Sequence, residues 1–170
     1  MILHFLRHAQ AENFDIERHQ HDRDRALTAE GVEQIQMAAE GLSRMKLHFD
    51  QIISSPYQRA VQTAQTVANV FQFSRPVHLS ENLAPDALFH RFRKEMLDLW
   101  TGFHSLLIVT HQPFVSECIS CLLTGKDVPL AVDMGTSTLC SLEIDSFFKG
   151  PSILVSMITA GQAALMRGDQ

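Results

Sequence analysis

The stretch Ile2–Ala11, "ILHFLRHAQA", places an arginine and a histidine directly after an apolar run. Residues 2–6 are short, apolar and unbroken by Gly or Pro, which is typical of a buried strand. A strand fixed in a core holds the residues at its end in a defined position. We therefore expect the strand to place Arg7 and His8 in a functional site at its carboxyl end.

Beyond this stretch, strand patterns alternate with helix patterns. Further strands are expected at 50–55, 76–80, 105–110, 137–144 and 152–159, and helices at 28–45, 55–71, 85–100 and 113–123. The run "SLLIVT" (105–110) is apolar on both faces, as in a central parallel strand. This alternation predicts one α/β domain over residues 1–170, a three-layer α/β/α sandwich with a mostly parallel central sheet.

Local signals set the expected ends and buried faces of the helices. Thr28 is expected to cap the first helix, and Ser55 with Pro56 to open the second. Gly125 is expected to close the helix that begins near 113. Two helical stripes are expected in the core: Val32, Ile35, Ala39 and Leu42, and Leu88, Phe92, Met96 and Leu99.

Composition excludes several classes of function. The chain has 14 Lys and Arg against 19 Asp and Glu, a net charge of −5, which argues against nucleic acid as a partner. No apolar run approaches the ~20 residues of a membrane span, and a signal peptide is not expected. Three cysteines make no disulfide framework, so the cytoplasm is the expected compartment. Cys118 and Cys121 lie in an apolar helical pattern, which favours packing over redox chemistry.

Four potentially cationic residues are expected at one edge of the sheet. Arg7 and His8 end the first strand, Arg59 lies in the first turn of the second helix, and His111 follows the strand 105–110. In open α/β sheets, ligands bind beyond the carboxyl ends of the strands. Paired guanidinium groups suit phosphate oxygens, so a compact phosphate dianion is the expected guest. Singly, each residue is better explained as a solvated cap or a structural histidine, and it is the placement of all four at one edge that favours a site.

Neither a metal nor a cofactor is expected. The polar segment "ERHQHDRDR" (17–25) contains His19 and His21, but alternating charges of this kind are typical of a solvated loop. The chain contains no H-E-x-x-H motif and no pair of acidic clusters suited to divalent ions.

Five motifs, in order, give the chain a family resemblance. They are "LRHAQAE" (6–12), "LTAEG" (27–31), "ISSPYQRAVQTA" (53–64), "LSENL" (79–83) and "IVTHQP" (108–113). Together they resemble the histidine phosphatase superfamily, also called phosphoglycerate mutase-like, and within it the small bacterial SixA-type branch that acts on phosphohistidine. The family fold is the α/β sandwich expected above.

The resemblance implies roles for particular residues. His8 would attack phosphorus and become transiently phosphorylated, with its other ring nitrogen bonded to a backbone carbonyl. Arg7, Arg59 and His111 would hold the phosphoryl oxygens. Glu81 would be a general acid for alkoxide leaving groups, or alternatively only a surface carboxylate at a strand end.

Three further positions are less certain matches to the family pattern. Arg25 precedes "ALT" where the branch has R-P-L-T, and is expected at the pocket mouth. Asn13 is a candidate phosphate contact, one residue closer to the histidine than in larger relatives. Ala9 replaces a family glycine, which raises the question of a local backbone shift.

The expected function is a metal-independent phosphatase with a phosphohistidine intermediate. Only the loop Ala9–Ala26 is long enough to cover the site, so an open site is expected. An open site favours a phosphorylated side chain on another protein, such as a histidine-phosphotransfer domain, over a free metabolite. The alternatives are a phosphatase of sugar phosphates or other small metabolites, a mutase, and a phosphate-binding module without catalysis.

Overall fold

The computed structural model describes residues 1–100, 102–126, 130–145 and 150–168. The strands are β1 (Ile2–Arg7), β2 (Gln51–Ser54), β3 (His78–Leu79), β4 (Ser105–Thr110), β5 (Leu139–Glu143) and β6 (Ile153–Ile158). The helices are α1 (Ala29–Ser43), α2 (Gln58–Val70), α3 (Phe89–Leu99), α4 (Phe114–Thr124) and α5 (Ala160–Leu165). Two 3₁₀ turns, η1 (Asp22–Asp24) and η2 (Glu81–Leu83), lie in connecting segments.

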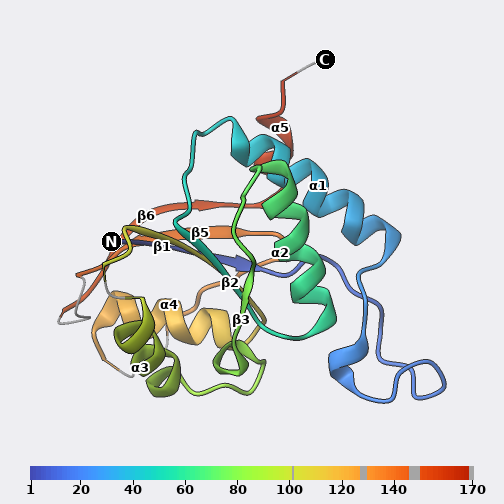
Figure 1. Ribbon diagram of the computed structural model, residues 1–170, viewed down its shortest axis with the longest axis horizontal. Helices are drawn as coiled ribbons and strands as arrows, with labels where there is room; N and C mark the ends of the chain where they lie inside the picture. The colour runs from blue at the N-terminus through green and yellow to red at the C-terminus, as the bar shows by residue number, and fades with distance from the viewer. Residues whose placement is uncertain (101, 127–129, 146–149, 169–170) are drawn as a thin grey trace.

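The six strands of the described residues form one sheet in the order β3-β2-β4-β1-β5-β6. The first four in this order run parallel to one another, whereas β5 and β6 pair antiparallel. The expectation of a mostly parallel sheet is confirmed. The parallel strands β2, β4 and β1 lie side by side at the centre, so their carboxyl ends meet at one edge (Figure 1).

Helices cover both faces of this sheet, as the α/β/α prediction requires. Alternate residues of each central strand belong to two separate apolar clusters, for example Phe5 in one and Leu6 in the other. One cluster joins the sheet to α3 and α4, and the other joins it to α1, α2 and α5. Both cores are closed by side chains with no exposed surface, among them Phe92 and Ile35.

Some helix details differ from the sequence prediction. The second helix begins at Gln58, with Tyr57 as N-cap, and not at Ser55 and Pro56. Ser55 is fully buried, and its hydroxyl lies 2.8 Å from Nε2 of His111 and accepts from the Tyr57 amide at 3.4 Å, so it caps no residue within the helix. The predicted core residues Val32, Leu88 and Leu99 are about half exposed, at 49%, 46% and 54%. Val32 lies in the first turn of α1, and Leu88 and Leu99 lie at the two ends of α3, whereas the covered members of each stripe lie further along the helix.

The sequence prediction missed the short helix α5. Thr159 caps it, because its side-chain oxygen accepts a hydrogen bond from the backbone N–H of Gln162. The side-chain oxygen of Gln162 in turn accepts from the backbone N–H of Thr159. This T-x-x-Q capping box was a readable helix start signal. The other end signal was read correctly, because Gly125 ends α4 in the left-handed conformation, with φ of 65°.

Two further sequence features are structural in character. Cys118 is fully buried, and burial raises the pKa of its thiol well above the ordinary value, which opposes thiolate chemistry. His19 is buried and its Nε2 lies 3.0 Å from a Glu12 carboxylate oxygen, so it links two parts of the loop.

The described part of the chain has no group of three or more His, Cys, Asp or Glu side chains arranged to hold a metal. It also has no helix long and apolar enough to cross a bilayer.

Candidate active site

The sheet register brings the two candidate histidines together. Arg7, the last residue of β1, pairs with Thr110, the last residue of β4, so His8 and His111 occupy equivalent positions one step further. The His8 amide donates to the Thr110 carbonyl at 3.0 Å, and the two imidazole centroids lie 4.9 Å apart. The strand pairing therefore fixes the backbone of both residues side by side.

Arg59 approaches the two histidines from the β2 side of β4, whereas His8 lies on the β1 side. It lies in the first turn of α2, which follows β2, the other neighbour of β4. Its Nε–H donates to Nε2 of His8 at 3.3 Å, and its guanidinium lies over the Tyr57 ring at 4.9 Å. The Arg59 side chain is only 3% exposed. The structure therefore brings together Arg7, His8, Arg59 and His111, which we call the strand-end cluster.

The surroundings of His8 define its tautomer. Nδ1 lies 2.7 Å from the Ala9 carbonyl oxygen, an acceptor only, so Nδ1 carries the proton. Nε2 then has a lone pair, the one that accepts from Arg59. Burial, together with the nearby Arg59, Arg7 and Arg25, lowers the pKa of His8 to about 4, although the Ala9 contact opposes this. At neutral pH the ring is therefore uncharged, with the Nε2 lone pair directed toward Arg59.

Ala9 replaces the family glycine without backbone strain. It is not among the residues with positive φ, and its methyl group is completely buried. Its amide donates to the Thr63 hydroxyl at 3.1 Å, which fixes the carbonyl that in turn holds His8. The local shift considered from the sequence is therefore not required.

Arg7 and His111 each bring a buried nitrogen without a partner in the described structure. One terminal nitrogen of Arg7 donates to the Met134 carbonyl at 2.8 Å, but its Nε has no hydrogen-bond acceptor. Nε2 of His111 lies 2.8 Å from the Ser55 hydroxyl, whereas its Nδ1 has no partner. Burial, the neighbouring His8 and the arginines lower the pKa of His111 to about 2. Unpaired buried groups of this kind are costly and are common where a ligand binds.

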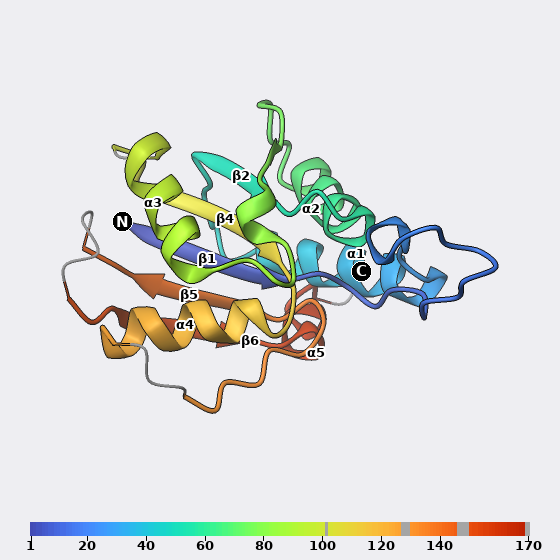
Figure 2. The same ribbon diagram turned by 90° about the horizontal axis from the view of Figure 1, so that it is seen from below.

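The loop after β1 covers the cluster, contrary to the open site expected from the sequence. This loop, drawn in blue, projects beyond the carboxyl end of β1 (Figure 2). Its turn η1 brings Asp22 against Arg59: one terminal nitrogen of Arg59 donates to the Asp22 carboxylate at 2.9 Å and the other to the Asp22 carbonyl at 2.8 Å. His8 is consequently only 9% exposed. Sequence reasoning missed Asp22, because nothing distinguishes it from the other charges of the loop.

Arg25, Glu81 and Asn13 lie around this cover. Arg25 donates to the Asp22 carboxylate at 2.8 Å and to the Glu12 carbonyl at 2.7 Å, and it is close enough to lower the pKa of both cluster histidines. The Glu81 carboxylate is 71% exposed and accepts from Arg23 at 3.3 Å, not from a cluster residue. Asn13 is exposed on the loop. Arg25 thus contacts the residue that covers Arg59, whereas the Glu81 carboxylate pairs with Arg23 outside the cluster.

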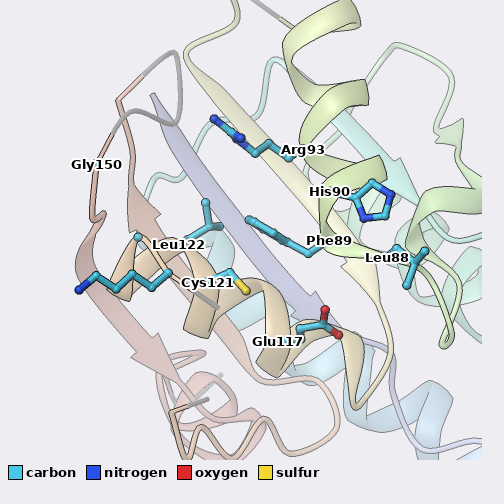
Figure 3. A pocket seen from close by; sticks show the side chains of 10 residues that line it. Leu88, Phe89, His90, Arg93, Glu117, Cys121, Leu122 and Gly150 are labelled. Carbon is cyan, nitrogen blue, oxygen red and sulfur yellow. The ribbon is translucent and has the colours of Figure 1, made fainter. Parts of the chain in front are cut away.

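A separate cavity lies between α3 and α4. It has a volume of about 500 Å³ and is lined by Leu88, Phe89, His90, Arg93, Glu117, Cys121, Leu122, Gly125, Lys126 and Gly150. Figure 3 shows these side chains around the groove between the two helices. None of them belongs to the strand-end cluster, so the cavity does not contribute to the chemistry described above.

The chain is similar to known phosphatases in both sequence and structure. Residues 3–85 match the model of the histidine phosphatase superfamily (branch 1). An uncharacterized protein of Picosynechococcus sp. is 32% identical over 128 residues, which are 74% of this chain and 75% of the relative. The chain belongs to the histidine phosphatase superfamily. The five motifs read from the sequence therefore identified the family correctly.

Two further similarities lie within this superfamily. Phosphohistidine phosphatase SixA of Escherichia coli is 24% identical over 132 residues, covering 76% of this chain and 79% of the relative. A structure of the protein histidine phosphatase SixA complexed with tungstate superimposes with a TM-score of 0.82 at 21% identity, covering 95% of this chain and 98% of that one. The fold is therefore the phosphoglycerate mutase-like fold, and the chain has almost the same extent as that small superfamily member.

Proposed function

We propose that this protein is a phosphatase that forms a phosphohistidine intermediate on His8 and acts on phosphohistidine of a partner protein. The observation that carries the proposal is the neutral His8, which presents a lone pair on Nε2 inside a group of arginines. A phosphoryl group needs both a nucleophile and positive charge around its oxygens, and this arrangement supplies both.

The first step is attack of His8 Nε2 on phosphorus. The N–P bond forms, the bond to the leaving imidazole or oxygen breaks, and the leaving group takes up a proton. Water then attacks the phosphorus of phospho-His8, releasing inorganic phosphate and restoring the imidazole. The Nδ1–H bond to the Ala9 carbonyl keeps Nε2 as the reacting atom and stabilises positive charge as it develops on the ring.

The unpartnered nitrogens of Arg7 and His111 are suited to hold the phosphoryl oxygens. The Ser55 hydroxyl accepts from the Tyr57 amide at 3.4 Å, so its own hydrogen can be donated to Nε2 of His111. The proton of the neutral imidazole then resides on Nδ1, the nitrogen without a partner. In this role His111 is an uncharged donor, while Arg7 and Arg59 supply the positive charge. Arg25, at the mouth, is proposed as a further phosphate contact and Asn13 as a peripheral one.

No metal enters this proposal, because the guanidinium groups already balance the charge of the transferring group. Incubation with excess EDTA, followed by gel filtration, should leave the rate of phosphate release unchanged. A large loss of rate that zinc or magnesium restores would contradict this part of the proposal.

Phosphohistidine is proposed as the substrate because the chain closely matches the extent of the SixA structure and its cover is a single loop. The cover consists of a short turn with no buried residue, which a docking protein can reach. A histidine-phosphotransfer domain phosphorylated on histidine is the proposed partner class. The covered state of His8 is the observation that favours a second candidate, a phosphatase of small metabolites, since enclosed sites grip small ligands better.

The two candidates are separated by kcat/KM measured side by side. The substrates are a phosphorylated histidine-phosphotransfer domain, free phosphohistidine, glucose 6-phosphate and 3-phosphoglycerate. We expect the phosphoprotein to exceed every small substrate at least about tenfold, or 1.4 kcal/mol of transition-state preference. A small metabolite that is better by the same factor would replace the first candidate with the second. No turnover of any substrate would favour a binding module.

A further inference from the structure

Asp22 contacts Arg59, the arginine that donates to Nε2 of His8. Arg59 donates from Nε to His8, and from its two terminal nitrogens to the Asp22 carboxylate and carbonyl. A planar guanidinium that donates two parallel bonds to oxygens is the same recognition unit that binds a phosphoryl group. In the structure, the loop itself supplies these oxygens.

The Asp22 carboxylate also contacts a second arginine, Arg25. One Asp22 oxygen accepts from Arg59 and the other accepts from Arg25 at 2.8 Å. Asp22 therefore bridges two cationic residues in the way that an oxyanion between them would. Its neighbour Asp24 has the same charge on the same turn, but its carboxylate accepts the His21 amide at 2.9 Å and forms no ion pair with an arginine of the described residues.

Burial shows that an incoming group has to displace this bridge. Arg59 is 3% exposed and His8 is 9% exposed, whereas the Asp22 side chain is 47% exposed. In addition, the lone pair of the nucleophile is occupied by the Arg59 Nε–H. A phosphoryl group reaches His8 only after Arg59 exchanges its present acceptors for phosphoryl oxygens.

We propose that Asp22 is a specificity-determining residue, a carboxylate that occupies Arg59 and Arg25 until a more highly charged oxyanion replaces it. A phosphate dianion carries twice the charge of the carboxylate and offers more acceptor oxygens, so it displaces Asp22, whereas weakly charged groups do not. Displacement releases η1 from Arg59 and uncovers His8. The inference rests on the proposed function only in taking phosphate as the guest of the cluster.

Binding of inorganic phosphate tests the proposal without any turnover. Calorimetric titration at pH 8 and 150 mM salt would compare the wild type with Asp22→Asn and with the matched control Asp24→Asn. Both variants lose one negative charge near the site, but only Asp22→Asn loses the charged contact with the arginines. We expect the Kd for phosphate to fall about tenfold in Asp22→Asn and to change less than twofold in Asp24→Asn.

Weaker or unchanged phosphate binding in Asp22→Asn, including no binding at all, would overturn the proposal and make Asp22 a residue that merely positions Arg59. Equal tightening in both variants would also overturn it, because it would assign the effect to net charge. Hydrogen exchange on the wild type avoids any variant: phosphate should speed exchange in peptides covering 21–25, and slower exchange would contradict displacement. If phosphate binds as expected but no phosphorylated substrate is turned over, the proposed function fails and the role of Asp22 stands.

Discussion

His4 lies within strand β1 and His8 directly follows its last residue. Burial lowers the pKa of each histidine to about 4. Their surroundings are otherwise different. His4 lies within β1, where Nδ1 contacts the Ser141 hydroxyl at 2.8 Å and the ring packs edge-on against Phe49. His8 lies beyond the strand end, where Arg59 donates to its second nitrogen.

The comparison separates what burial does from what the site does. Burial, joined by the nearby arginines in the case of His8, leaves both imidazoles neutral at pH 7, so a lowered pKa does not identify a nucleophile. Of these two histidines, His8 is the one that combines the neutral ring with a fixed tautomer and neighbouring guanidinium groups. The position one step past the strand end, and not the residue type, makes the difference.

The largest expected effect comes from replacing each histidine with alanine. His8→Ala should reduce phosphate release at least about 10³-fold, because it removes the proposed nucleophile. His4→Ala should keep kcat/KM within about threefold while lowering the free energy of unfolding by about 3 kcal/mol, since it leaves a cavity in the core. Rates with a phosphorylated substrate and urea denaturation measure the two effects. An active His8→Ala protein would abolish the distinction between the two histidines.

How far the site was predictable follows from the same distinction. Arg7, His8, Arg59 and His111 were found from sequence because each is tied to a strand end or to the helix turn after a strand, and the sheet pairing fixes their positions. Asp22 was not found, since the loop contains several equivalent charges and only the fold selects which one reaches Arg59. The α/β/α layers followed from the alternation of strands and helices.

The misreadings of the helices have a related cause. Ser55 had the chemistry of an N-cap, but its hydroxyl is used by His111, a residue 56 positions away that no local signal reveals. Val32 and Leu99 fitted a helical period, yet the period cannot show where the covering layer ends. The role of Glu81 as a general acid stays a prediction. In the structure its exposed carboxylate pairs with Arg23 and contacts no residue of the strand-end cluster.

The pH dependence of the two histidines should differ in what it affects. In the proposed mechanism neutral His8 is the reactive form, so initial rates should be flat from pH 7 to about 5 and fall only as pH approaches its pKa of about 4. For stability the sign is the same for both: a folded pKa below the ordinary 6.5 means that the unfolded chain binds more protons between pH 6.5 and 4.

The contribution of each histidine to the free energy of unfolding should therefore be fully present above pH 6.5. It should decrease as pH falls through that window, by about 2 kcal/mol per histidine at pH 5. His4→Asn should remove its share of this slope without moving the pH profile of the rate. Urea denaturation at several pH values, beside initial rates, provides the check. A rate profile that breaks near pH 6.5 would show that His8 is not held neutral by its surroundings.

A smaller effect is expected from Ser55→Ala. Loss of the hydroxyl leaves Nε2 of His111 without its partner, so the ring can carry its proton on either nitrogen. The expected result is a fall in kcat of about tenfold with little change in KM, because the tautomer matters most as charge develops on the phosphoryl group. Ser55→Thr, which keeps the hydroxyl, should recover most of the rate, and its failure to do so would point to packing as the cause.

The smallest effect is expected from Glu81→Gln. p-Nitrophenyl phosphate has a leaving group that needs no proton, so its turnover should change less than about threefold. Alkyl phosphates should slow more if Glu81 donates a proton to the departing oxygen. Parallel assays of both substrates decide the matter, and equal rates for wild type and variant on both would leave Glu81 as a rim carboxylate that pairs with Arg23.

The most direct measurement identifies the phosphorylated atom. Rapid mixing with a phosphorylated histidine-phosphotransfer domain, followed by quenching in alkali and peptide analysis by mass spectrometry and ³¹P NMR, should find phosphate on the peptide that contains His8. The account predicts attachment at Nε2, because Nδ1 donates to the Ala9 carbonyl. Phosphate on Nδ1, or turnover with no phosphate on His8 at any time, would contradict it.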